Sequence, residues 1–264
     1  MKLCLLGALW GDICGVPYEF CPERNTAKIN LNHPLRMISD DSILTLAVAK
    51  AILEQRPYRD VIFEMAQQYP DAGWGGMFYR EWVQKKNPIP YNSFGNGAAM
   101  RVSPVAWAFN TVEDVLREAA ATAACSHNHP KGIECAQATA LAIFLARKGQ
   151  DKADICAEIT ERFGYELTND LEQLRYEAEA VGFDETWVSV PQAISAFLST
   201  NSFEECLLET IALGCDADTQ AAISCAIAEA YYGVDEALAN KVTFFLNPQL
   251  KKIWSAFSTR YGVE

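Results

Sequence analysis

Apolar residues recur along the chain at helical spacing, and polar capping residues mark where helices should begin. Ser39 precedes Asp40, Asp41 and an apolar run over residues 43–53, and Pro57 follows. A capping hydroxyl, acids in the first turn and a proline after the last turn are typical of a helix with defined ends. This segment therefore predicts a helix that starts just after Ser39.

Four further pairs predict helix starts by the spacing of a capping box, in which a polar capping residue is followed three positions later by an acid or an amide. The pairs are Thr111 with Asp114, Asp151 with Asp154, Ser189 with Gln192, and Ser202 with Glu205. Pro191 would then lie in a first turn, where its missing N–H is harmless. Gly214 and Gly233 follow apolar runs, as helix-ending glycines do.

The remaining pattern also favours helices. The apolar stretch Leu3 to Trp10 is too short for a signal peptide before Asp12 interrupts it, which predicts a buried first helix. Tyr69 to Gly97 is rich in Gly, Pro, Asn and aromatic residues and should be loop with short helices. No alternating pattern is long enough for a sheet, and no linker or repeat divides the chain. We expect one all-α domain over residues 1–264.

Composition narrows the class of protein. The chain has 264 residues, half of them hydrophobic, and a formal net charge of −12. This balance argues against nucleic acid as a partner and against a polybasic membrane anchor. No apolar run reaches the roughly 18 residues of a membrane span. The nine cysteines have no C-x-x-C pair, which favours buried thiols in a reducing, cytoplasmic compartment over zinc or disulfides.

Two pairs of acids stand at predicted helix starts. Asp40 and Asp41 are adjacent after Ser39, and Asp216 and Asp218 are followed by Thr219. One interpretation is capping, because an acid in a first turn binds free N–H groups. The other is a site for Mg²⁺ or Mn²⁺, which prefer carboxylate and hydroxyl oxygens. The spacing alone leaves both open.

Glycine and histidine mark another candidate site. Ser93-Phe94-Gly95-Asn96-Gly97 is either an ordinary turn or a backbone nest for a phosphate. His127 and His129 belong either to a helix junction or to a binding site, in a chain with three histidines. Arg101 could contact a ligand phosphate or form a buried salt bridge. No Walker A, Rossmann glycine, H-E-x-x-H or G-x-S-x-G motif is present.

Five segments, taken in order, resemble the ADP-ribosylglycohydrolase family. They span residues 7–233 and lie in the family's order, so together they are far more specific than any one alone. The matches are Gly11-Asp12 with Gly15, Tyr18 and Glu19; Ser39 to Ser42; Gly95 to Arg101; Ser126 to Pro130; and Asp216 to Ala222.

The resemblance implies a fold and a site. It implies a single orthogonal multi-helix all-α domain with two divalent cations, Mg²⁺ or Mn²⁺, in a central cleft. The implied metal ligands are Ser39, Asp40, Asp41, Asp216, Asp218 and Thr219. The implied ADP-ribose cleft is lined by Ser93, Phe94, Gly95, Asn96, Gly97 and His127, with Phe94 stacked on adenine. Glu19, with Asp40 and Asp41, is the implied catalytic set.

The resemblance also implies the reaction. It implies a metal-dependent hydrolase that cleaves ADP-ribose from an acceptor, either a protein side chain such as arginine or serine, or a small molecule. The alternative is a non-catalytic relative that binds ADP-ribose or serves as a crystallin. Asp12, which lies in or at the end of the first helix, is expected to position groups beside the metals. Glu229 stands where small residues are common in the family, and we expect it to alter helix packing.

Overall fold

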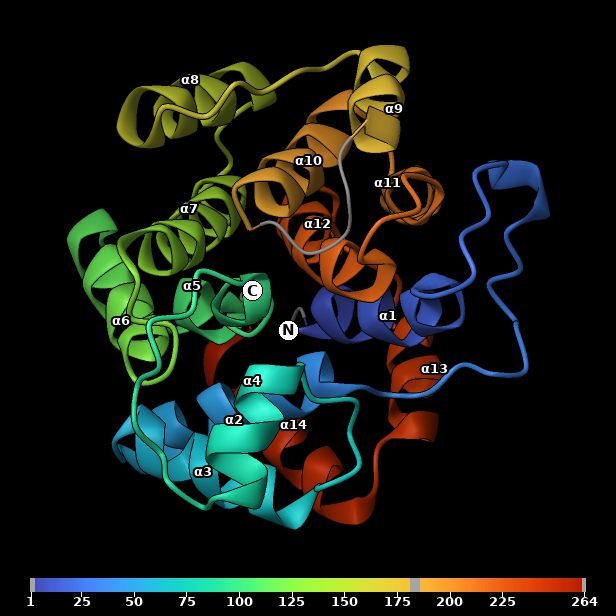
Figure 1. Ribbon diagram of the computed structural model, residues 1–264. Helices are drawn as coiled ribbons and strands as arrows, with labels where there is room; N and C mark the ends of the chain where they lie inside the picture. The colour runs from blue at the N-terminus through green and yellow to red at the C-terminus, as the bar shows by residue number, and fades with distance from the viewer. Residues whose placement is uncertain (1–2, 181–185, 263–264) are drawn as a thin grey trace.

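The protein folds into α-helices and short helical turns, with no β-strand among residues 3–180 and 186–262, which the computed structural model describes (Figure 1). The all-α prediction is confirmed. The helices are α1 (Leu6–Gly15), α2 (Asp40–Glu54), α3 (Tyr58–Gln68), α4 (Gly76–Phe78), α5 (Ser103–Ala108), α6 (Val112–Ala124), α7 (Pro130–Arg147), α8 (Lys152–Phe163), α9 (Leu171–Ala180), α10 (Thr186–Ser199), α11 (Phe203–Ala212), α12 (Ala217–Tyr232), α13 (Ala237–Phe245) and α14 (Pro248–Tyr261).

Most predicted caps are confirmed. The Ser39 hydroxyl accepts a hydrogen bond from the Asp41 amide at 3.1 Å, at the start of α2. Thr111, Asp151 and Ser202 accept equivalent bonds from the third residue along, at the starts of α6, α8 and α11. Gly214 follows α11 with φ of +68° and Gly233 follows α12 with φ of +73°. A positive φ is easily adopted only by glycine, so these two residues end their helices.

The cap predicted at Ser189 is wrong. Helix α10 starts at Thr186, so Ser189 and Pro191 lie inside it. Ser189 is buried, and its hydroxyl accepts a hydrogen bond from the Asn96 side-chain amide at 3.4 Å. This hydroxyl is therefore engaged by a distant loop, a partner that local spacing does not reveal.

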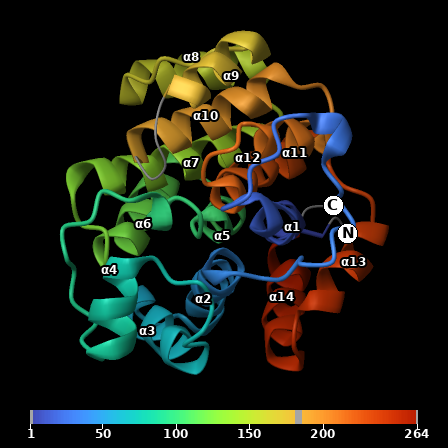
Figure 2. The same ribbon diagram turned by 45° about the vertical axis from the view of Figure 1, so that its right-hand side comes forward.

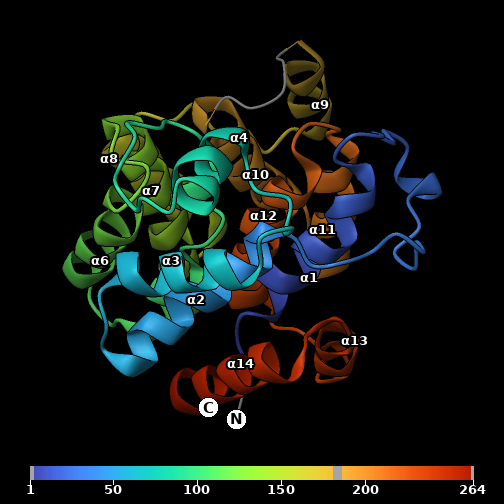
Figure 3. The same ribbon diagram turned by 60° about the horizontal axis from the view of Figure 1, so that its bottom comes forward.

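Helices α1 and α12 pack closely at the centre of the molecule, side by side in all three views (Figures 1, 2 and 3). Gly7, Gly11 and Gly15 form a stripe along α1 with four-residue spacing. A Cβ at these positions would lie 2.1 Å from the Cys225 carbonyl oxygen, 2.2 Å from the Ala221 carbonyl oxygen and 2.3 Å from the Asp218 Cα. Only glycine therefore allows the two backbones to come this close.

Glu229 joins the same pair of helices. Its carboxylate accepts hydrogen bonds from the backbone amides of Leu6 at 3.0 Å and Gly7 at 2.8 Å, the first residues of α1. Burial raises the pKa of this carboxyl to about 8, against the opposing effect of those two hydrogen bonds. We expected Glu229 to alter helix packing, and it does so by capping the start of α1. This helix has no capping side chain next to it in the sequence.

The other helices surround this pair. Helices α8 and α9 lie at one end of the molecule and α13 and α14 at the other (Figures 2 and 3). The start of the chain is fixed to α14 by Trp254 and Ser258, which each donate a hydrogen bond to the Cys4 carbonyl at 3.0 Å. All nine cysteines are described, and none forms a disulfide. Across the described ranges, no helix is both long and apolar enough to cross a membrane.

We predict that Gly11→Ala strongly destabilises the protein. Its Cβ would meet the backbone of Ala221 and Ala222 at 2.2–2.7 Å, and backbone atoms cannot move aside as a flexible side chain can. Overpacking of this kind costs about 1–3 kcal/mol or more. Thermal unfolding measures the loss. Gly76→Ala is the control, because nothing lies within 4 Å of its added Cβ; equal stability of the two variants would contradict the close contact of α1 with α12.

Candidate active site

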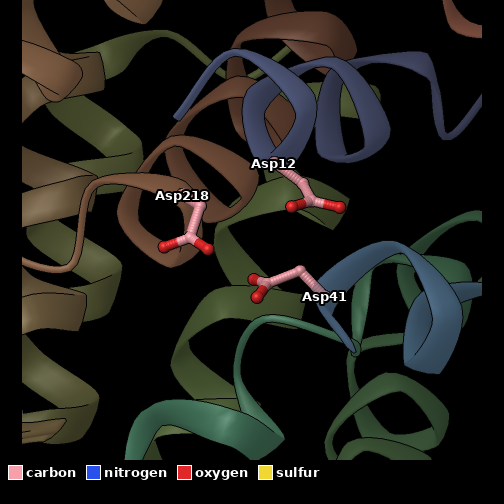
Figure 4. Close-up of side chains that lie close together, drawn as sticks. All are labelled: Asp12, Asp41 and Asp218. Carbon is pink, nitrogen blue, oxygen red and sulfur yellow. The ribbon is translucent and has the colours of Figure 1, made fainter. Parts of the chain in front are cut away.

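Three helices bring buried carboxylates together. Asp12 comes from α1, Asp41 from the first turn of α2 and Asp218 from the first turn of α12, and their side chains point toward one another (Figure 4). One carboxylate oxygen from each lies within 4.8 Å of the others. A second group, with the same spacing, contains Glu19, Asp216 and Asp218. Asp218 therefore belongs to both groups.

Asp12 is fixed to the start of α2. Its carboxylate accepts hydrogen bonds from the Ser39 amide at 3.0 Å, the Ser39 hydroxyl at 2.7 Å and the Ser42 amide at 3.1 Å, and a further bond from the Ser42 hydroxyl. Neither Asp12 nor Ser39 lines the neighbouring cavity. Four donors on one buried carboxylate hold α1 against the N-terminus of α2.

Asp41 has an unused acceptor. Its Oδ2 accepts a hydrogen bond from the Thr219 hydroxyl at 3.2 Å and a longer contact of 3.3 Å from the Ser39 hydroxyl. Its Oδ1 is buried, and no hydrogen-bond partner for it exists in the part of the chain that the structure describes. A buried carboxylate oxygen without a donor is costly unless a cation or a proton satisfies it.

The acids raise one another's affinity for protons. Burial, followed by the charges of neighbouring acids, holds the pKa of Asp40, Asp41 and Asp218 well above the ordinary carboxyl range. No lysine or arginine is among the residues that line the cavity. Divalent cations would satisfy both the excess negative charge and the free oxygen, so the residues present fit an oxygen-ligated metal site.

The acids form the floor of a cavity of about 600 Å³. The cavity brings together every predicted site residue except Ser39 and Asp12, which lie beneath it. These are Glu19, Asp40, Asp41, Ser93, Phe94, Gly95, Asn96, Gly97, His127, Asp216, Asp218 and Thr219. Asp40 lines the cavity but is in neither of the close acid groups.

The glycine-containing turn is anchored at both ends. The Asn96 side-chain amide donates to the Asp216 carboxylate at 2.6 Å, which joins the turn to the start of α12. At the other end, the Tyr91 amide donates to the Ser126 carbonyl at 3.1 Å and the Asn92 amide to the Asn128 side chain at 2.7 Å. The turn is thus held over the acids by contacts with α12 and with the junction between α6 and α7.

The two histidines have different positions. His127 is buried and lines the cavity, and its Nε2 would lie 2.9 Å from a Cβ placed on Gly97. His129 caps α7 by accepting a hydrogen bond from the Lys131 amide at 3.1 Å, and its ring lies edge-on to Phe94, with centroids 5.7 Å apart. Phe94 is 45% exposed at the edge of the cavity. One histidine faces the cavity and the other supports its rim.

Arg101 has neither of the two expected contacts. It is fully buried, does not line the cavity, and forms no ion pair within the described residues. It donates instead to the Thr122 carbonyl at 2.7 Å and the Ser126 hydroxyl at 2.8 Å. These partners lie at the end of α6, where carbonyl groups and the helix dipole favour a cation.

One wall of the cavity was not predicted. Trp74, Met77 and Phe78 line it, from the segment that was expected to be loop with short helices. The structure confirms that expectation, with α4 followed by a π-helix over Tyr79–Gln84. Trp74, Phe78 and Trp82 stack in turn, with centroids 5.0 and 5.1 Å apart. Their spacing of four residues was the available signal for this aromatic ladder.

Comparisons with known proteins agree on one family. A sequence profile described as ADP-ribosylglycohydrolase matches residues 1–242. ADP-ribosylhydrolase ARH3 of Mus musculus is 27% identical, and the alignment covers 88% of this chain and 84% of that protein. ADP-ribosyl-[dinitrogen reductase] glycohydrolase of Rhodospirillum rubrum is 30% identical, with 88% and 85% covered.

A solved structure agrees as well. It is described as an ADP-ribosylglycohydrolase-related protein complex, and it superposes with a TM-score of 0.73 over 97% of this chain and 95% of that chain. At 21% identity this likeness shows the fold, and it confirms the predicted orthogonal multi-helix type.

We predict that Asp218→Asn stabilises the protein in metal-free buffer at neutral pH. Its raised pKa means that the ionised form destabilises the fold, while Asn can still accept the 3.0 Å bond from the Thr219 amide. Removing this unfavourable charge should therefore raise the melting temperature above that of the wild-type protein, and thermal unfolding in EDTA measures the difference. The exposed Asp235→Asn is the control. A lower melting temperature for Asp218→Asn in EDTA would contradict the predicted repulsion.

Proposed function

The chain belongs to the ADP-ribosylglycohydrolase family, and we propose that it hydrolyses the glycosidic bond between ADP-ribose and an acceptor. Family membership confirms the resemblance found in the five sequence segments and identifies a glycosidase-type hydrolase. The observation that carries the proposal is the convergence of Glu19 and four aspartates on the floor of one cavity, beneath the Gly95–Gly97 turn.

We propose that two divalent cations, Mg²⁺ or Mn²⁺, bind at these acids. Ser39, Asp40, Asp41, Asp216, Asp218 and Thr219 would hold them. The free Oδ1 of Asp41, the raised pKa values and the membership of Asp218 in both acid groups support this assignment. When bound, such cations orient hydroxyl oxygens and lower the pKa of water.

The protein's own residues would divide the remaining tasks. Cleavage at an anomeric carbon develops positive charge on the sugar, which nearby carboxylates stabilise. Glu19 is half-buried beyond the 3₁₀ turn Val16–Tyr18 and has an oxygen within 4.8 Å of Asp216 and Asp218. We propose that Glu19 accepts a proton from the attacking water. We infer that Asp40 and Asp41 assist it through their charge.

The nucleotide would lie along the other side of the cavity. Phe94 offers an exposed ring for stacking on adenine, worth roughly 1–3 kcal/mol in comparable sites. Because no lysine or arginine is among the described residues that line the cavity, the diphosphate would be bound by backbone amides of the Gly95–Gly97 turn, by His127 and by the cations. Asp12 would position Ser39 and the start of α2 without touching substrate.

A screen of ADP-ribosylated substrates would identify the acceptor. Relatives are named for different acceptors: an ADP-ribosylarginine hydrolase of Pseudomonas putida is 24% identical, over 88% of this chain and 70% of its own length. We expect release of ADP-ribose from one of ADP-ribosylarginine, an ADP-ribosylated serine peptide or O-acetyl-ADP-ribose, measured by HPLC. EDTA should abolish release and Mg²⁺ or Mn²⁺ should restore it. Binding of ADP-ribose with no release from any substrate would instead identify a binding protein.

We predict that Glu19→Gln retains the fold and most of the affinity for ADP-ribose but lowers kcat by about 10²-fold or more, the scale of a lost general base. Asp12→Asn is the matched comparison. Its amide group cannot accept all four hydrogen bonds from Ser39 and Ser42, so stability should fall while turnover at saturating metal changes less. Near-normal turnover by Glu19→Gln would contradict this role and would indicate that Asp40 or Asp41 is the general base.

A further inference from the structure

We propose that Arg101 and Ser126 form a buried relay that fixes His127 in the tautomer protonated on Nε2, so that the ring presents an N–H donor to an oxygen of the bound nucleotide. Arg101 and Ser126 are positioning residues in this scheme, because neither lines the cavity. The ligand in the proposal rests on the proposed function, whereas the tautomer is a property of the protein alone.

The direction of the hydrogen bonds follows from donor chemistry. A guanidinium nitrogen can only donate, so the 2.8 Å contact from Arg101 Nη2 makes the Ser126 hydroxyl oxygen an acceptor. The second hydrogen on Nη2 is used by the Thr122 carbonyl at 2.7 Å. The Ser126 hydroxyl therefore keeps its own hydrogen free to donate.

His127 Nδ1 is the best acceptor for that hydrogen. It lies 2.8 Å from the Ser126 hydroxyl. The other neighbour, the Cys125 thiol, is a weak acceptor and itself donates to the Thr122 carbonyl at 3.0 Å. When Nδ1 accepts, a neutral imidazole must carry its proton on Nε2.

The surroundings keep the ring neutral and oriented. Burial, reinforced by the Arg101 charge, holds the pKa of His127 well below its usual range. The Tyr91 ring packs edge-on against the imidazole, with centroids 5.5 Å apart. Nε2 faces the Gly95–Gly97 turn, where an added Cβ on Gly97 would lie 2.9 Å away. An Nε2–H group there complements a phosphate or hydroxyl oxygen, in a cavity lined by no lysine or arginine among the described residues.

The relay also explains a buried arginine that has no acid beside it. Within the described residues, Nε and Nη1 of Arg101 have no hydrogen-bond partner. A carboxylate beside Arg101 would compete with His127 for the hydrogen of the Ser126 hydroxyl, because an ionised carboxylate only accepts hydrogen bonds. With no ion pair to Arg101 among the described residues, His127 Nδ1 is the strongest acceptor near the Ser126 hydroxyl.

The tautomer can be measured directly in the ligand-free protein. Long-range ¹H–¹⁵N correlation spectra of labelled protein at neutral pH distinguish the protonated from the unprotonated ring nitrogen. With three histidines in the chain, a His127→Gln sample assigns the signals. We expect a single His127 tautomer with the proton on Nε2. A proton on Nδ1, an averaged mixture or an imidazolium ion would overturn the relay.

Variants test each member of the relay. Ser126→Ala should release His127 into a mixture of tautomers and weaken ADP-ribose binding by about three- to tenfold, the value of one hydrogen bond. Ser103→Ala is the matched control, since Ser103 is also a buried hydroxyl but has no partner among the described residues. Arg101→Met should also give a mixture. If Arg101→Met fails to fold, the spectra of the wild-type protein and of Ser126→Ala still test the relay.

The outcomes separate this proposal from the function. An unchanged tautomer in Ser126→Ala overturns the relay, and a changed tautomer with unchanged ADP-ribose affinity overturns the donor role of His127. If wild-type protein does not bind ADP-ribose, the proposed function fails together with the ligand named here, while the spectra still confirm or overturn the tautomer.

Discussion

The close contact between α1 and α12 is the constraint on which the site depends. Gly7, Gly11 and Gly15 let the two backbones approach to distances that any side chain would prevent. That approach places Asp12 beside Asp218, and the hydrogen bonds that Ser39 and Ser42 donate to Asp12 then bring in α2. Three segments that are far apart in the sequence thereby bring carboxylate oxygens to within 4.8 Å of one another.

The cost of this arrangement is electrostatic. Several carboxylates share a small buried volume, with no lysine or arginine among the described residues that line the cavity, and the pKa values of Asp40, Asp41 and Asp218 rise accordingly. The starts of α2 and α12 offset part of this cost, because helix N-termini stabilise negative charge. The electrostatic repulsion that remains makes the site suitable for cations. The acid cluster destabilises the metal-free protein, and a bound cation would remove that repulsion and stabilise the fold.

Three ionisable side chains outside the cavity have a different role. Glu229 replaces a missing cap at the start of α1, and Arg101 binds the end of α6 while supplying hydrogen bonds toward His127. Lys152 donates to the carbonyls of Phe197 and Leu198 at the end of α10. In each case a helix end that lacks partners forms hydrogen bonds with an ionisable side chain from another part of the chain, so these side chains join helices as well as satisfy their free backbone groups.

The sequence by itself determined the helical class, most helix starts and the residue types of the site, because caps, helical periodicity and the five family segments are local signals. The same signals placed Asp40 and Asp218 at helix starts and Glu19 beyond the first helix. Three outcomes were decided by the tertiary structure alone. Ser189 lies inside a helix and accepts a hydrogen bond from Asn96, and Arg101 donates to Ser126. Trp74 and Phe78 form a wall of the cavity. These outcomes depend on which distant atoms meet, and that is set by how closely the helices pack.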